Sequence, residues 1–301
     1  MAIGYHHVDV FSDRPFTGNS LAVFVDPPPL NEGQMTRLTQ ELRHFETIFV
    51  RTSEEPDVVH ARVFDLMGEL DFAGHPVLGA AAVLHERSAV AYGEARHWTF
   101  VLGARNVDIT THGDTAGQVS ALLDQGRPEL VRPTVPLEPV AAALGLTPAD
   151  LDDTLPPEII STGLRYLVVP VRDGDVLARA RITHPDFEGF LGGLGAQYVY
   201  VLDAGTVEGR HWNNDGLLED VATGSAAGCV AAYLMRHGRA RDGEELSLAQ
   251  GRFTGRPSRI AITAYGTPDA VERVTVGGGV SMVATGTLRA LPEASPASTA
   301  T

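Results

Sequence analysis

The sequence predicts an α/β protein made of two similar domains, each wrapped around a buried central helix. The main observation is an internal repeat: ELDFAGHPVLGAAAVL at residues 69–84 aligns without gaps with EDVATGSAAGCVAAYL at residues 219–234. The alignment pairs Gly74 with Gly224, an offset of 224 − 74 = 150, half of the 301 residues. Both segments are rich in glycine, alanine and valine, and helices that are apolar all round are buried. Chance identity among small residues is the alternative to duplication.

The N-terminal half alternates strands with one clear amphipathic helix. Asn31 is a plausible N-cap with Gln34 three residues later, and apolar residues then recur at helical spacing up to Phe45. The run from Thr47 to Val50 has strand character, so Glu46 is expected at a helix-to-strand junction. The other strands expected in this half cover residues 8–11, 21–25, 61–64, 97–102 and 106–110.

The C-terminal half begins after a proline-rich stretch at residues 126–139, which is typical of a linker. We therefore expect one domain over residues 1–127 and a second over 128–288, whose last strands may return to the first domain. Residues 289–301 are of low complexity and are expected to be disordered. The elements expected beyond the linker are a helix near 140–144 and strands at 166–171, 197–202, 259–263 and 280–284.

Composition and charge narrow the class of protein. The 23 basic and 38 acidic side chains give a net charge of 23 − 38 = −15, which argues against a nucleic-acid partner. No apolar run reaches the roughly 18 residues of a membrane span, and the N-terminus has no signal-peptide pattern, so a cytoplasmic protein is expected. The single cysteine, Cys229, excludes an internal disulfide.

The two repeated helix starts indicate possible anion sites. The first-turn amides of a helix lack intrahelical partners and lie at the positive end of the helix dipole. The helix starts GlyHisPro at 74–76 and GlySerAla at 224–226, with Gly74, Gly224, Ser225 and Ala226, would leave these amides open to a small carboxylic acid held in a cleft between the domains. The alternative is tight packing, with Thr223 or Ser225 as an ordinary helix cap.

Several segments together resemble the PhzF-like isomerases, a family named for a phenazine-biosynthesis enzyme and built on the diaminopimelate epimerase fold. They are YHHVDVFSDRPFTGNSLAVFVD, HFETIFV, ELDFAGHPVLGAAAVL, STGLRYLVVPV, EDVATGSAAG and QGRFTGRPS, and they cover nearly the whole chain. The resemblance implies two pseudo-symmetric α/β domains, each a curled β-sheet or barrel around a central helix. It also implies a homodimer without metal or organic cofactor.

The resemblance also assigns candidate site residues. Glu46 in HFET matches the catalytic glutamate of the family, His75 matches the histidine of its AGHP motif, and Asp220 with Ser225 matches the acid and hydroxyl of EDxATGSA. Asn19 in the GlyAsnSer segment and Trp212, whose ring suits stacking on a flat substrate, are further candidates for substrate binding. Asp220 and His75 are expected to pair.

The thiol chemistry of true epimerases is not available to this chain. Gly74 and Asp220 occupy the positions where the two cysteines of those enzymes would be needed, and Cys229 is expected to be a buried structural residue. A single carboxyl group near its pKa can instead take a proton from an activated carbon and deliver it elsewhere. Phe45 and Ile48 beside Glu46 would favour this by desolvation.

The implied reaction is a cofactor-free proton shift on a small unsaturated cyclic amino or carboxylic acid, in secondary metabolism. Dihydro-hydroxyanthranilate-like and pyrroline or 4-alkylproline-type acids are the candidate substrates. Departures from the family pattern at Ser20, Arg43–Phe45, Asp65, Leu66, Val221 and Trp212 indicate a retuned pocket. The alternatives are an amino-acid racemase without cysteine bases and a non-catalytic protein that binds small acids; a metal site at His6, His7 and His211 lacks suitable spacing.

Overall fold

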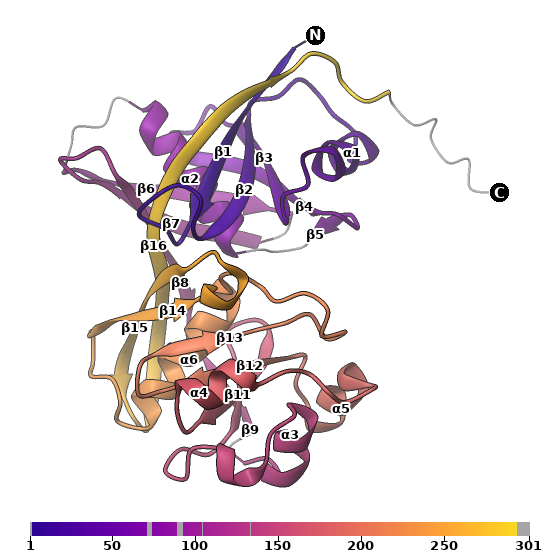
Figure 1. Cartoon of the computed structure of the whole chain (residues 1–301). Coiled ribbons are helices and arrows are strands. Elements are labelled where there is room, and N and C mark those ends of the chain that lie inside the picture. Colours follow the sequence, from indigo (N-terminus) through magenta and orange to yellow (C-terminus); the bar gives the residue numbers. More distant parts are fainter. Residues whose placement is uncertain (1, 71–73, 89–92, 104, 133, 294–301) are drawn as a thin grey trace. The chain divides into compact units, whose positions relative to one another are not determined.

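The computed structural model describes residues 2–70, 74–88, 93–103, 105–132 and 134–293 (Figure 1). Within these ranges the chain divides into two compact units. Unit 1 comprises residues 1–123 and 278–301, and unit 2 comprises residues 124–277. No helix in the described ranges is long and apolar enough to cross a membrane.

Unit 1 contains a curled sheet with the strand order β16-β1-β2-β3-β4-β6-β7-β8. Its neighbours are antiparallel except for the parallel pairs β2–β3 and β4–β6. The strands are β1 (Ile3–Val10), β2 (Asn19–Val25), β3 (Glu46–Thr52), β4 (Val58–Asp65), β6 (Ala95–Leu102), β7 (Arg105–Gly113), β8 (Val119–Gly126) and β16 (Ala270–Leu288), with a short β5 (Glu69–Leu70) beside β4.

Helix α2 (Gly74–Arg87) lies inside this curl, in contact with β1, β2, β3, β6 and β7. Its side chains from His75 to His85 are all buried, as the small-residue repeat predicted. Close approach explains one of its glycines: a Cβ on Gly79 would lie 2.5 Å from the side chain of Leu21. Helix α1 (Glu32–Leu42) covers the opposite face of the sheet through Met35 and Leu38, and the predicted capping box of Asn31 and Gln34 is present.

Unit 2 has the strand order β9-β10-β11-β12-β13-β14-β15-β16. Its neighbours are antiparallel except for β11–β12 and β13–β14. The strands are β9 (Glu129–Arg132), β10 (Glu158–Ser161), β11 (Arg165–Val171), β12 (Tyr198–Asp203), β13 (Glu208–Arg210), β14 (Glu245–Gln250) and β15 (Ser258–Thr267). Helix α6 (Gly224–Arg236) packs on β10, β11 and β15, and it is buried along nearly its whole length.

The two units share one internal topology. Read along each sheet, the neighbouring pairs are antiparallel, antiparallel, parallel, antiparallel, parallel, antiparallel and antiparallel. In each unit the second parallel connection carries the buried helix, and these helices begin at Gly74 and Gly224, the two glycines that the alignment pairs. Matching strand order and direction therefore supports the internal duplication.

Two stretches differ from simple linkers or tails. The proline-rich stretch contains β9, whose residues Glu129, Leu130 and Arg132 pair with β10 of unit 2, so this part of the stretch belongs to the sheet. Of the expected disordered tail, residues 294–301 lie outside the described residues. The preceding residues contact α1: Gln34 Nε2 donates to the Pro292 carbonyl at 2.8 Å and Arg37 donates to that of Glu293 at 2.9 Å.

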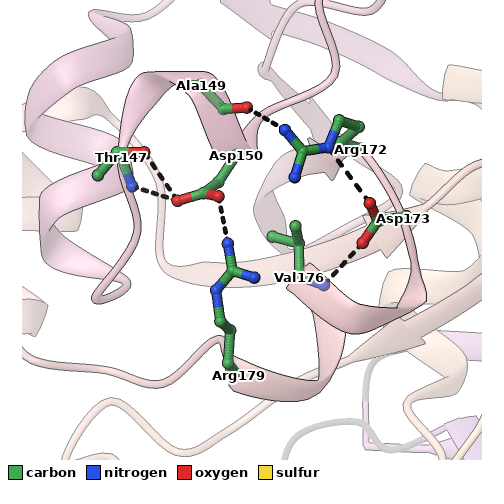
Figure 2. A network of polar contacts seen from close by, with 7 residues as sticks. All are labelled: Thr147, Ala149, Asp150, Arg172, Asp173, Val176 and Arg179. Carbon is green, nitrogen blue, oxygen red and sulfur yellow. Dashed lines mark hydrogen bonds and ion pairs between the residues drawn. The ribbon is translucent and has the colours of Figure 1, made fainter.

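Three further helices complete unit 2: α3 (Leu137–Ala143), α4 (Gly174–Arg179) and α5 (Phe187–Leu194), with short 3₁₀ turns at Pro148–Asp150 and Arg252–Thr254. A surface network fixes α4 (Figure 2). Asp173 caps the helix by accepting from Val176 N at 2.9 Å, Arg172 donates to the Ala149 carbonyl at 3.0 Å, and Arg179 pairs with Asp150. The network thereby ties α4 to the 3₁₀ turn at 148–150.

Candidate active site

Glu46 and His75 lie together in unit 1. Glu46 is the first residue of β3, where the chain resumes an extended conformation after a left-handed residue, Arg43, ends α1. It pairs with Leu21 of the parallel strand β2, and Leu21 contacts α2 at Gly79, so Glu46 projects toward the same helix. One Glu46 carboxylate oxygen, Oε2, lies 3.5 Å from Nδ1 of His75, the second residue of α2.

The electrostatic state of His75 follows from its burial. Its side chain is 8% exposed, and this burial lowers its pKa to about 3, because the imidazolium form loses its hydration. At neutral pH the ring is therefore uncharged and carries one proton. Nδ1 faces Glu46, and Nε2 is buried without a hydrogen-bond partner among the described residues. A neutral imidazole beside a carboxylate can orient that carboxylate and leave one nitrogen for a ligand.

The remaining candidates of unit 1 lie nearby in the chain. Asn19 is the first residue of β2; it is 2% exposed and pairs with Val10 of β1. Gly74 is the first residue of α2, and a Cβ there would meet nothing closer than Leu123 Cδ2 at 4.0 Å. The segment that would cap this helix, residues 71–73, lies outside the described residues, so the anion site at α2 stays a prediction.

Ser20 and His44, two of the positions that depart from the family pattern, are in contact. Ser20 Oγ lies 2.7 Å from His44 Nδ1 and 2.9 Å from His7 Nε2, and the two imidazole rings are 4.4 Å apart between centroids. Ser20 alternates along β2 with Leu21, so it points to the opposite face of the sheet from Leu21 and Glu46. Ser20, His44 and His7 therefore form a polar cluster on the face of the sheet opposite to Glu46.

Asp220 is partly buried in unit 2, just before α6. Burial raises the pKa of its carboxyl group, while His211 and several hydrogen bonds oppose that rise. Oδ2 accepts from Thr223 Oγ1 at 2.6 Å, and Oδ1 receives a longer bond from Ala222 N at 3.4 Å. Thr223 is the N-cap residue of α6, yet its hydroxyl makes no cap hydrogen bond and serves Asp220 instead.

The amide of Gln250 fixes the direction of this network. Its Oε1 accepts from the backbone N–H of Thr223 at 3.2 Å and from Tyr200 OH at 3.0 Å. Nε2 consequently donates to Thr223 Oγ1 at 2.9 Å and to the main-chain carbonyl of Asp220 at 3.0 Å. Because the threonine oxygen already accepts from Gln250, its own proton is directed at the Asp220 carboxylate.

The start of α6 holds the other unit 2 candidates. Ser225 Oγ is 2.7 Å from the hydroxyl of Tyr166, and the Gly224 carbonyl accepts from Gln125 at 2.9 Å. Ala226 is fully buried, so its main chain is the part that a ligand would have to address. The anion-binding role of Gly224, Ser225 and Ala226 remains a prediction.

Trp212 is packed in the interior of unit 2. It is 5% exposed and belongs to the hydrophobic core of unit 2, with the Arg210 guanidinium 4.5 Å from its ring centroid. Little of the indole is left exposed by this packing, and its role as a stacking surface for a substrate stays a prediction. Cys229 is likewise buried, and desolvation raises its thiol pKa to about 12, which makes it a poor nucleophile at neutral pH.

Sequence reasoning did not single out three residues around Asp220 and Ser225, namely Tyr166, His211 and Gln250. His211 was considered only as a metal ligand, and the described residues contain no group of three or more acidic, histidine or cysteine side chains that could hold a metal ion. All three residues lie next to the EDVATGSA motif in the folded structure. This proximity could have identified them, but the spacing of residues along the sequence does not reveal it.

Comparison with known proteins shows the family of this chain. Residues 8–286 match the family model PhzC-PhzF, described as phenazine biosynthesis-like protein. A trans-2,3-dihydro-3-hydroxyanthranilate isomerase of Pseudomonas chlororaphis is 32% identical over 296 residues, covering 94% of this chain and 99% of that protein. A structure titled as a predicted epimerase from Pseudomonas aeruginosa has 44% identity and a TM-score of 0.85, covering 96% of this chain and 99% of its own.

Two further structures define how far the likeness extends. A phenazine biosynthesis protein of the PhzF family from Bacillus anthracis has 26% identity and a TM-score of 0.82, over 96% of this chain and 99% of its own. A probable proline racemase from Agrobacterium radiobacter K84 has 14% identity and a TM-score of 0.60, covering 94% of this chain and 92% of its own, and it shows the fold alone.

The fold and its relatives define the class: an isomerase with two curled α+β units of the diaminopimelate epimerase type. Within that class the chain belongs to the phenazine biosynthesis-like (PhzC-PhzF) family.

Proposed function

We propose that this protein is a cofactor-independent isomerase that moves a proton, and with it a double bond, within a small unsaturated cyclic amino or carboxylic acid. Glu46 is the proton carrier. The observation that carries the proposal is the approach of Glu46 Oε2 to Nδ1 of a buried, neutral His75 in a member of an isomerase family. A carboxylate held in this way can accept a proton from one carbon and return it to another.

Asp220 and Ser225 are a second set of polar groups, at the start of α6 in unit 2, that can bind a small acid. A partly buried carboxyl group with a raised pKa, such as that of Asp220, is able to exist as the neutral acid and so to bind an amine, a hydroxyl or a carboxylate. The Ser225 hydroxyl, held by Tyr166, adds a donor or acceptor of fixed position. The Pseudomonas relatives are named for trans-2,3-dihydro-3-hydroxyanthranilate, which makes this compound the first candidate substrate and secondary metabolism the proposed setting.

A substrate panel tests the proposal. Purified protein is offered dihydro-hydroxyanthranilate and pyrroline-type unsaturated amino acids, and double-bond migration is followed by absorbance while binding is followed by calorimetry. Wild type is expected to convert at least one member, and Glu46→Gln is expected to bind it without turnover. Activity retained in Glu46→Gln would contradict the role of Glu46. Binding without turnover in wild type would favour a small-acid-binding protein, and exchange only at an amino-acid α-carbon would favour a racemase.

We also propose a cytoplasmic homodimer, as the family resemblance implies. Each chain has a mass of 32.1 kDa, so sedimentation should report 2 × 32.1 = 64.2 kDa. A mass of one chain over the whole concentration range would reject the dimer.

A further inference from the structure

His211 lies directly across from Asp220 in the backbone of unit 2. Trp212 and Glu219 form an isolated antiparallel bridge, and the backbone N–H of Asp220 donates to the His211 carbonyl at 2.9 Å. Directly opposed residues of an antiparallel pair place their side chains on the same face, with Cβ atoms about 5 Å apart. The side chains of His211 and Asp220 therefore project together on one face, and those of Trp212 and Glu219 on the other.

On the opposite face of the bridge, the charge of Glu219 is balanced by Arg210. Arg210 donates two hydrogen bonds to Glu219, at 2.9 and 2.7 Å, and donates further bonds to three carbonyls at the C-terminal end of α4. Its guanidinium is thus fully used on the core face, away from Asp220. Because successive side chains alternate between the two faces, Glu219 lies beside Arg210 on one face and Asp220 lies beside His211 on the other.

Hydrogen bonding restricts His211 to one protonation site. Nδ1 lies 2.8 Å from the Val199 carbonyl, which only accepts, so Nδ1 carries a hydrogen in every state. The ring is 6% exposed and stands edge to face against Tyr166 and Tyr198, at 5.6 and 5.7 Å between centroids. A second proton can be accepted only at Nε2.

Burial then constrains the charge of the two groups together. A lone carboxylate or a lone imidazolium in such a position is strongly disfavoured, whereas a pair with one proton between them has no net charge. The titratable side chains that face His211 from the packed elements are Tyr166 on β11, Tyr198 on β12 and Asp220 itself. Among them the carboxyl group of Asp220 is the one able to exchange a proton with an imidazole near neutral pH.

We propose that His211 and Asp220 form a one-proton pair, in which His211 is a positioning residue that sets whether Asp220 meets its ligand as acid or as carboxylate. The two states are carboxylic acid with neutral imidazole, and carboxylate with imidazolium; in both the pair holds one proton, either on the Asp220 carboxyl group or on Nε2 of His211. Mutual influence of the two groups, opposed by burial of both, supports the pairing. The catalytic consequence rests on the proposed function.

The pairing is tested first without any substrate. Protein labelled with ¹⁵N-histidine is titrated from pH 5 to 9 by NMR as wild type, as Asp220→Asn and as the control His184→Gln, which changes a histidine outside the pair. The expected result is an Nδ1–H tautomer for His211 and an imidazole titration midpoint that falls by about one pH unit or more in Asp220→Asn, with no change in the control. An unchanged His211 titration in Asp220→Asn would overturn the proposal.

A second variant protects the test against misfolding of Asp220→Asn. In His211→Gln the carboxyl group of Asp220, followed by ¹³C-aspartate labelling, should keep its proton to higher pH, because the imidazolium that favours the carboxylate is gone. In an active enzyme the acid limb of the pH–rate profile should then move upward by about one unit. An unmoved carboxyl titration would reject the pair, whereas lack of turnover in wild type would reject only the proposed function.

Discussion

At the scale of single residues, burial of His75 has a consequence for stability. Its pKa is lowered to about 3 in the folded protein, while an unfolded histidine titrates near 6.5. The unfolded state therefore binds more protons between these values, and folding stability is lost as the pH falls below about 6.5. The loss from this one group is at most about 1.4 kcal/mol per pH unit.

The contribution of His75 to the pH dependence of stability can be measured by urea unfolding between pH 7 and 4.5. We expect the free energy of unfolding of wild type to fall more steeply with acid than that of His75→Gln, by up to about 1.4 kcal/mol per unit. Parallel curves for the two proteins would mean that His75 takes up its proton in the folded state.

Single residues also show what a sequence can indicate about a site. Glu46 and His75 belong to separate motifs in the sequence, and the fold brings Glu46 Oε2 to 3.5 Å from His75 Nδ1. His211 has no such signal, because its relation to Asp220 depends on a two-residue bridge closed by residues 213–218. Trp212 is 5% exposed in the core of unit 2, and the sequence alone does not distinguish a buried tryptophan from a half-exposed one.

At the scale of elements, β13 is packed so tightly that its glycine is needed. A Cβ on Gly209 would lie 2.1 Å from the Tyr200 ring, which is fully buried and donates to Gln250. Gly209→Ala should lower the free energy of unfolding by about 1–3 kcal/mol or more, since an overpacked core cannot relax fully. It should also weaken ligand binding, because Gln250 orients the Thr223 hydroxyl toward Asp220.

The same substitution in α5 should have the opposite sign. No atom lies within 4 Å of a Cβ built on Gly192, which is helical, so Gly192→Ala should raise the free energy of unfolding by roughly 0.5–1 kcal/mol. Urea denaturation of both variants checks the pair. A destabilised Gly192→Ala or an unaffected Gly209→Ala would contradict this view of the packing.

Elements differ in how well the sequence predicts them. The expected strands and α1 follow hydrophobic periodicity and a capping box, and they form close to where expected, whereas β5, β8, β9, β10, β13 and β14 were not predicted. Helix α5 was not predicted, because its sequence FEGFLGGL carries three glycines, each unfavourable in a helix. It forms because Phe187 and Leu191 are buried and Asp186 caps it by accepting from Gly189 N at 3.0 Å. Tertiary packing decides here against local propensity.

The N-cap residue of α5, Asp186, allows a further test of the view that interactions outside local propensity stabilise this helix. Asp186→Ala should lower the free energy of unfolding by about 1 kcal/mol, whereas Asp186→Asn, which keeps an acceptor at the N-cap, should stay near wild type. Urea denaturation compares the three proteins. Equal losses in both variants would indicate that the capping oxygen is not what Asp186 contributes.

At the scale of the whole molecule, the duplication is visible in topology more clearly than in sequence. Few residues of the repeat are identical, yet both units follow one order of strand directions around a buried helix. Small residues are retained where a helix must fit inside a curled sheet, which explains why the sequence signal is confined to α2 and α6. The rest of each unit diverged further, because a strand requires only apolar residues and not small ones.

The central claim is that Glu46 moves a proton within the substrate, and NMR in deuterated water tests it most directly. Wild type with a converted substrate should place deuterium at the carbon that gains the proton, together with double-bond migration. Glu46→Gln should bind the same substrate and leave both its double bond and its label unchanged. Deuterium incorporation by Glu46→Gln at the wild-type rate would contradict the account.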